Sequence, residues 1–330
     1  MLSSLLGQKS ALCAGAAPGA KPDVHDLSYY GKCCLGGILA CGLTHTAVCP
    51  IDIVKCRLQS IKDPIEKKKS GIGSMAKQLI AQKGYSWMSL GYLPTFIGYS
   101  LQGMGKFGFY ELFKDVYGGM IGPEKAYEYR TLLYASASAS AEFIADTMLC
   151  PLEAVKVKIQ TADPLGSYPS NFFVAWNTLK QAEGFNGFYK GINALWGRQI
   201  PYTIMKFVAF EKIVEFIFTK ILKKERSEVS RSVNLSMTFV AGYLAGILCA
   251  VVSHPADTMF TKLTKLDDKG STFSANLKKI YGEIGFMGLW SGLIPRIIMV
   301  GTLTGLQWWI YDSFKTAMGL QPTGSNLKKH

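Results

Sequence analysis

The stretch Pro50-Ile-Asp52-Ile-Val-Lys55-Cys-Arg57-Leu-Gln59 sets how the chain is organised, because similar stretches begin at two later prolines. The second reads Pro151-Leu-Glu153-Ala-Val-Lys156-Val-Lys158-Ile-Gln160. The third, more degraded, reads Pro255-Ala-Asp257-Thr-Met-Phe260-Thr-Lys262-Leu-Thr264. In the first two copies an acid precedes a base by three residues, which places both charges on one helix face. A single copy would be an ordinary helix end, whereas three copies in register indicate an internal repeat.

Each copy ends a long apolar segment, and a second long segment follows after a short helix bounded by glycines. Every long segment has the length needed to cross a bilayer core of about 30 Å. Six crossings would place both termini on one side. The predicted long segments are 29–59, 91–117, 131–160, 192–222, 235–264 and 293–318, with short helices near 74–82, 171–181 and 274–281. The predicted divisions are an N-terminal extension 1–28, repeats 29–122, 123–227 and 228–320, and a C-terminal tail 321–330.

Composition fits a helical membrane bundle around a polar interior. Hydrophobic residues make up 48% of the 330, and the mean hydropathy is +0.16. Residues that face an internal cavity need not be apolar, which explains the intermediate value. The net charge of +13 suits an anionic partner, but the basic residues are dispersed and no nucleic-acid motif is present, so nucleic acid is disfavoured. The eight cysteines lack a paired C-x-x-C spacing and are expected to be reduced packing residues.

A second motif is repeated near the end of each even-numbered segment: Tyr110-Glu111-x-x-Lys114, Phe210-Glu211-x-x-Val214 and Tyr311-Asp312-x-x-Lys315. Together, the two tripled motifs resemble the mitochondrial carrier family over about residues 29–318. Within that family, the chain most resembles carriers of inorganic phosphate. Three features carry this resemblance: Thr44-His45-Thr46, Glu142, and a third proline motif that lacks its base.

The resemblance implies an all-α membrane protein whose six transmembrane helices form a threefold pseudosymmetric barrel, each repeat having a short helix on the matrix side. It implies a secondary transporter, not an enzyme, without a cofactor. The protein would be a multi-pass monomer in the mitochondrial inner membrane, with both termini on the intermembrane-space side, in contact with lipid such as cardiolipin. Residues 1–28 look neither like a secretory signal nor like a convincing transit peptide, and are expected to be an extension.

By the same resemblance, two ionic gates flank a central substrate site. The matrix gate would pair Lys55 with Glu153 and Lys156 with Asp257, braced by Gln59 and Gln160; Asp52 would lack a base because Phe260 stands in its place. The intermembrane-side gate would pair Lys114 with Glu211 and Lys315 with Glu111; Asp312 would lack a partner because Val214 replaces the base. Two bonds of three in each gate should lower the barrier to switching.

The substrate site is sought where the repeats differ, because an asymmetric load needs asymmetric contacts. We take Pro94, Ala194 and Pro295 as equivalent positions of the three even-numbered segments. The residues four, eight and twelve positions after them lie on one helix face and include three cations and several polar side chains. Charged residues inside membrane spans are costly and by default functional. Three cations with polar donors suit a small, strongly charged anion such as phosphate. The alternative is that Lys106 and Lys206 extend to the membrane interface. The predicted substrate-binding residues are Lys106, Arg198, Lys206, Gln102, Gln307 and Tyr202.

Three further groups are candidates for proton coupling: His45, Glu142 and Asp146. Imidazole titrates near physiological pH, and two carboxylates on one helix face favour holding a proton. The alternative is a purely structural histidine. Phosphate entering with a proton, or in exchange for hydroxide, would add no excess charge to the cavity.

Other interpretations fit the sequence less well. Gly103-Met-Gly105-Lys-Phe-Gly108 satisfies a dinucleotide pattern, but no strand precedes it, so close helix packing is preferred. Cys41, His45 and Cys49 share a helix face and are weak candidates for a metal, because some carriers of phosphate are also thought to move copper; ordinary packing is preferred. The sequence shows no catalytic set of residues that would support an enzyme. A helical-repeat adaptor should not have such long apolar segments. A carrier of another small anion, such as a dicarboxylate, remains the nearest alternative.

Overall fold

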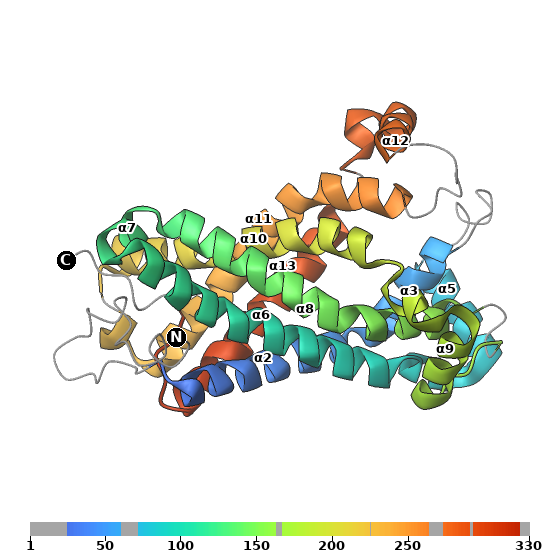
Figure 1. Ribbon diagram of the computed structural model, residues 1–330, viewed down its shortest axis with the longest axis horizontal. Coiled ribbons are helices and arrows are strands. Elements are labelled where there is room, and N and C mark those ends of the chain that lie inside the picture. Colours follow the sequence, from blue (N-terminus) through green and yellow to red (C-terminus); the bar gives the residue numbers. More distant parts are fainter. Residues whose placement is uncertain are drawn as a thin grey trace.

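Six long helices stand side by side (Figure 1), and the contacts between neighbouring helices close them into a ring. The structure is a computed structural model, and it describes residues 25–60, 72–162, 167–224, 226–263, 273–290 and 293–323. Within those residues every regular element is a helix, and α13 packs back on α2 to close the ring. The predicted all-α architecture of three helix pairs is confirmed. In ring order the long helices are α2 (Leu27–Ala47, continued by α3, Cys49–Ser60), α6 (Tyr92–Ile121), α8 (Arg130–Thr161), α10 (Ile192–Phe216), α11 (Arg231–Leu263) and α13 (Leu293–Ala317).

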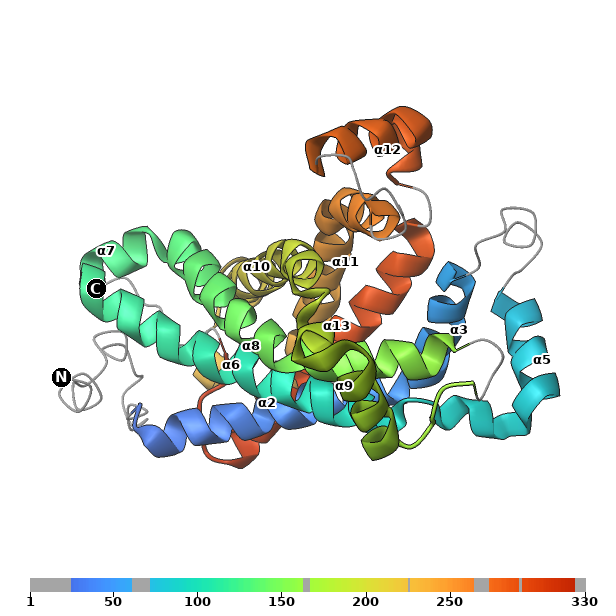
Figure 2. The same ribbon diagram turned by 45° about the vertical axis from the view of Figure 1, so that its right-hand side comes forward.

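The three proline motifs lie at one end of the ring, here called the motif end, together with the short helices (Figures 1 and 2). These are α5 (Ile72–Lys83) with η2 (Gly84–Ser89), α9 (Phe172–Tyr189) and α12 (Phe273–Gly288). Each contacts the motif-bearing helix of its own repeat. Gly84, Gly184 and Gly285 have φ of 60°, 67° and 62°, a conformation that only glycine adopts at little cost. An equivalent glycine therefore turns the chain in each of the three repeats.

The opposite end, here called the acidic end, holds the tripled acidic motif of the even helices. Helix α2 begins there and α13 ends there (Figure 1). Repeats 1 and 2 are joined at this end by α7 (Pro123–Glu128), and repeats 2 and 3 by η3 (Ile217–Leu222) and η4 (Arg226–Glu228).

The first long segment differs from its prediction as one continuous helix, because it is interrupted at Val48. Helices α2 and α3 meet there at an angle of 57°. Pro50 has no N–H to donate back to the Thr46 carbonyl, and its ring crowds that carbonyl. Pro151 and Pro255 hold the equivalent positions inside continuous helices α8 and α11, so the proline alone does not force a break.

Hydropathy singles out fewer spans than the six that the sequence predicts. In the part of the chain that the structure describes, Arg231–Met259 is long and apolar enough to cross a membrane, and Leu27–Ala47 with Cys49–Leu58 would be a second, bent span. The other long helices have 25 to 32 residues but carry buried charged and small polar side chains, which lower their hydropathy.

Glycines bring the paired helices of repeats 1 and 3 into backbone contact. A Cβ on Gly103 would lie 2.2 Å from the Gly37 carbonyl oxygen, and one on Gly37 would lie 2.1 Å from that of Gly103. In repeat 3, a Cβ on Gly246 would lie 2.7 Å from the Cα of Gly301. The G-x-G-x-x-G pattern is therefore a helix-packing surface, as preferred from the sequence.

We expect Gly103→Ala to destabilise the protein, because the added methyl would push α6 away from α2. Overpacking of this kind costs about 1–3 kcal/mol. Gly119→Ala is the matched control on the same helix, because no atom lies within 4 Å of its added Cβ. Thermal unfolding of detergent-purified protein, followed by the reactivity of the native cysteines, should show a lower midpoint for Gly103→Ala alone. Equal midpoints would contradict the contact.

Candidate functional site

A group of buried polar side chains lies inside the ring, about halfway along it, and is here called the central polar cluster. Helices α2, α6, α8, α10 and α13 contribute to it. Its lysines occupy equivalent positions on α6 and α10, where α13 carries a glutamine. Each of these side chains is at most 6% exposed. The cluster consists of Thr44, Gln102, Lys106, Glu142, Asp146, Lys206 and Gln307.

In one half of the cluster, a single lysine faces two carboxylates. Lys106 Nζ lies 3.0 Å from Glu142 Oε1. The Gln102 amide donates to Glu142 Oε1 and to Asp146 Oδ1, each at 3.0 Å. The second oxygen of each carboxylate is buried without a hydrogen-bond partner in the described part of the chain. Burying two carboxylates against one cation leaves a negative charge uncompensated, which favours holding a proton there.

In the other half, a lysine lacks a carboxylate partner. Lys206 donates to the side-chain oxygen of Gln307. The Gln307 amide in turn donates to Thr44 Oγ1 at 3.3 Å. Across the described ranges no carboxylate forms an ion pair with Lys206, which is 1% exposed. A buried cation held only by a neutral amide is poised to accept an anionic ligand. The interface-seeking alternative for Lys106 and Lys206 is wrong, because both are buried.

Two predicted residues stand apart from the cluster. Arg198 precedes Lys206 by eight residues on α10, about 12 Å along the axis towards the motif end. It is half-buried and has no hydrogen-bond or ion-pair partner among the residues described. Tyr202 lies between them and is also half-buried.

His45 contacts an aromatic ring that the sequence did not single out. It stacks on Tyr99 with ring centroids 3.8 Å apart, and neither Glu142 nor Asp146 forms a hydrogen bond to it in the described chain. The Tyr99 hydroxyl lies 3.5 Å from Lys156 Nζ. Tyr99 therefore links His45 to a charged residue of the motif end. A signal for it was available, since Tyr99 precedes Gln102 by one helical turn.

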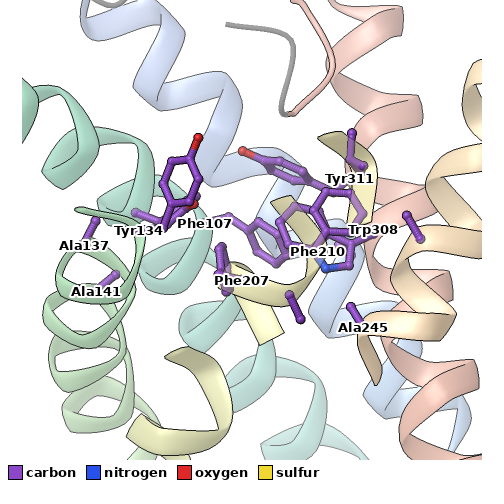
Figure 3. Packing of buried hydrophobic residues seen from close by; sticks show 14 of the residues in the cluster. Phe107, Tyr134, Ala137, Ala141, Phe207, Phe210, Ala245, Trp308 and Tyr311 are labelled. Atoms are coloured by element: carbon purple, nitrogen blue, oxygen red, sulfur yellow. The ribbon is translucent and has the colours of Figure 1, made fainter. Parts of the chain in front are cut away.

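Two layers of aromatic rings lie between the central polar cluster and the acidic end along the even helices. Figure 3 shows rings of both layers, such as Phe207 and Phe210, packed together. Phe107, Phe207 and Trp308 each follow directly after a residue of the cluster, and a second layer follows one turn later. Ring centroids of Phe210 and Trp308 are 3.6 Å apart and nearly parallel. Hydrated ions do not pass such a packed apolar layer. The second layer consists of Tyr110, Phe210 and Tyr311.

Beyond these layers, buried ion pairs join the ends of the even helices. Lys114 Nζ lies 3.2 Å from Glu111 and 3.6 Å from Glu211, and Lys315 Nζ lies 3.5 Å from Glu111. The two pairs proposed from the sequence are thus present. The expectation that Asp312 lacks a partner is wrong, because Arg226 binds it at 2.7 Å. Arg226 lies outside both repeated motifs, so no repeat pattern could have identified it.

The motif end is joined differently from the sequence expectation. Lys156 Nζ lies 3.5 Å from Asp52 and 3.5 Å from Glu153, instead of pairing with Asp257. Asp257 pairs with Arg296 of its own repeat. The expected Lys156–Asp257 pair is therefore not formed in this structure, in which Arg296, one residue after the α13 proline position, binds Asp257. In the described residues, no ion pair at this end links repeat 3 to the other repeats, and α12 lies apart from α5 and α9 (Figures 1 and 2).

Some predicted gate residues lie outside the described part of the chain, and the metal candidates are not brought together. The side chains of Lys55, Gln59 and Phe260, and residue Thr264, lie outside the described residues. Gln160 donates to the Leu90 carbonyl at 3.3 Å and joins repeats 1 and 2. No group of three His, Cys, Asp or Glu side chains in the described part of the chain is arranged to hold a metal ion, so Cys41, His45 and Cys49 do not converge there.

Comparison with known proteins places these features in one family. Residues 26–120, 127–221 and 231–321 each match the family model described as mitochondrial carrier protein. The Caenorhabditis elegans "Phosphate carrier protein, mitochondrial" is 51% identical over 314 residues, which cover 94% of this chain and 88% of the relative. The Schizosaccharomyces pombe "Probable mitochondrial phosphate carrier protein" is 47% identical over 310 residues, covering 94% and 97%. The Bos taurus "Solute carrier family 25 member 3" is 52% identical over 287 residues, covering 87% and 76%.

Proposed function

Because this chain belongs to the mitochondrial carrier protein family, we propose that it transports inorganic phosphate with a proton across the mitochondrial inner membrane into the matrix. Exchange of phosphate for hydroxide is the equivalent description. The names of its relatives support phosphate as the substrate. The ring closes within one chain, which supports a monomer as the transport unit.

The observation that carries the proposal is the buried cation without a carboxylate partner, Lys206, in the same layer as Lys106. A phosphate ion brings the negative charge that Lys206 lacks and several acceptor oxygens. Gln307 and Thr44 could turn their polar atoms to it. Arg198 also has no partner in the described chain. It would bind the phosphate ion on its path between the motif end and Lys206. Lysine binds phosphate as a point charge and needs no fixed planar geometry.

Proton coupling is proposed from the other half of the cluster. Lys106 neutralises one of the carboxylates Glu142 and Asp146, and the remaining charge favours a shared proton. Arrival of the phosphate charge beside Lys106 would weaken the Lys106–Glu142 pair, and this would strengthen the hold of the carboxylates on that proton. Phosphate and proton would then favour each other's binding. His45 is not hydrogen-bonded to Glu142 or Asp146 in the described chain, and we assign it a supporting role in proton transfer.

Alternating access is proposed from the unequal ends. The acidic end is closed by ion pairs and two aromatic layers, whereas repeat 3 is not ion-paired to the others at the motif end within the described residues. This arrangement suits a carrier closed towards the intermembrane space. In that orientation the motif end faces the matrix and both termini face the intermembrane space.

The test is uptake of labelled phosphate by purified protein reconstituted in liposomes. With the lumen alkaline relative to the outside, we expect phosphate uptake to be much faster than at equal pH. The rate should be unaffected by added malate at matched concentration. Empty liposomes and liposomes that contain heat-denatured protein are the controls. Uptake of malate in place of phosphate would identify a dicarboxylate carrier, and phosphate uptake independent of the pH gradient would contradict proton coupling.

A further inference from the structure

Both carboxylate oxygens of Asp312 are occupied by groups that lie outside the repeated motifs. Its Oδ2 accepts from Arg226 Nη2 at 2.7 Å and from Thr238 Oγ1 at 3.1 Å. Its Oδ1 accepts from the backbone N–H and the hydroxyl of Thr323, at 3.1 and 2.9 Å. These four residues are between 0 and 7% exposed. The acid for which the motif supplies no base thus accepts four hydrogen bonds in the described part of the chain.

Arg226 is held in place independently of Asp312. Its Nε donates to Asn234 Oδ1 at 2.7 Å and its Nη2 donates to Thr238 Oγ1 at 2.5 Å, both on α11. Its guanidinium lies over the Phe218 ring, 5.4 Å from the centroid, on η3. Because η3 continues α10 directly, the arginine connects the end of α10 to α13. A base at Val214 on α10 would connect the same two helices.

We propose that the contact among Arg226, Thr238, Asp312 and Thr323, here called the Asp312 latch, is the third bond of the gate at the acidic end. Arg226 is then a positioning residue that supplies the charge missing at Val214, and Thr323 adds the segment that follows α13 to the gate. The latch must open whenever the carrier opens to the intermembrane space. The role in transport rests on the proposed function, but the gate itself can be tested without phosphate.

The latch is a contact that can break and re-form. Its hydrogen bonds are charge-assisted and buried, so they strongly favour the closed state. Arg226 Nη1, however, is buried with no hydrogen-bond partner in the described chain, which weakens the contact as a whole. Removing Arg226 leaves the Asp312 charge buried with only neutral donors, and this should shift the gate towards opening.

The gate can be followed through the native Cys33, which is fully buried beside Tyr311 and Lys315. Intact mitochondria that express each variant are treated with sulfonatoethyl methanethiosulfonate, an anionic thiol reagent that does not cross the inner membrane. Labelling of the Cys33 peptide is measured by mass spectrometry over time. We expect Arg226→Ala to label about tenfold faster, the effect of losing one charge-assisted hydrogen bond. Arg231→Ala, an exposed arginine nearby on α11, should label like the unmodified protein.

The decisive variant is Arg226→Ala combined with Val214→Lys, which returns a base to the motif position. We expect it to restore slow labelling, whereas a merely structural role for Arg226 would not be rescued from α10. Should Arg226→Ala fail to accumulate in mitochondria, Thr323→Val carries the test, because it removes one donor and should accelerate labelling by a smaller factor. Unchanged labelling, or acceleration that Val214→Lys does not reverse, would overturn the latch. Labelling that follows these expectations with no phosphate uptake would retain the latch and reject the substrate.

Discussion

Lys206→Gln should nearly abolish phosphate transport, in both proton-driven uptake and phosphate/phosphate exchange. Lys206 is the buried cation that no carboxylate of the described chain neutralises, so its charge is available to the substrate. Truncating one partner of a buried charge interaction costs about 2–5 kcal/mol, which is roughly a 30- to 5000-fold loss. Initial rates over a range of phosphate concentrations, measured in liposomes, would check it. We expect the loss to appear as weaker apparent affinity as well as a lower maximal rate.

Lys212→Gln is the matched control for this prediction. Lys212 lies on the same helix, but its side chain is 36% exposed and pairs with Glu215 at 3.4 Å. Solvent-accessible pairs of this kind contribute about 0–1 kcal/mol. Lys206→Arg should recover part of the activity, since it keeps the charge but changes its shape. Near-normal exchange by Lys206→Gln would remove Lys206 from the substrate site.

The repeat makes the overall fold accessible from the sequence. Three copies of one motif define three helix pairs, and the equivalent positions of Lys106, Lys206 and Gln307 predict that their side chains share one layer. The same equivalence does not single out the aromatic layers, because Phe107, Phe207 and Trp308 look like ordinary apolar residues of a span. Symmetry therefore predicts which residues share a level, but not what they contact.

Contacts that break the symmetry are the ones that sequence reasoning missed. Arg226 comes from an irregular connection, and Thr323 from the segment after the last helix, so no repeat position points to either. Arg296 pairs with Asp257 within its own repeat, whereas the expected pair, Lys156 with Asp257, joins two repeats. The break at Val48 could not be predicted from Pro50 alone, since equivalent prolines leave α8 and α11 continuous. None of these features recurs in the three repeats, so the repeat pattern could not predict them.

Glu142→Gln should uncouple phosphate transport from proton transport. The amide can still bond to Gln102 but cannot bind a proton by titration, and it leaves Lys106 without its carboxylate partner. Phosphate binding is then not weakened, because the cluster becomes more positive. Coupling free energies between two ligands are about 1–3 kcal/mol, a factor of about 5–150. We expect uptake driven by a pH gradient to fall by a factor in that range, while phosphate/phosphate exchange at equal pH is largely retained.

Both assays are run on the same batch of liposomes, so that differences in reconstitution cancel in the ratio of uptake to exchange. Glu128→Gln, an exposed acid on α7, is the control and should leave that ratio unchanged. Asp146→Asn should lower the ratio as well, because the Gln102 amide donates to both carboxylates and, under the proposed coupling, the two share one proton. If Glu142→Gln lowers uptake and exchange by the same factor, Glu142 serves substrate binding or folding, and the proton must be carried by another group.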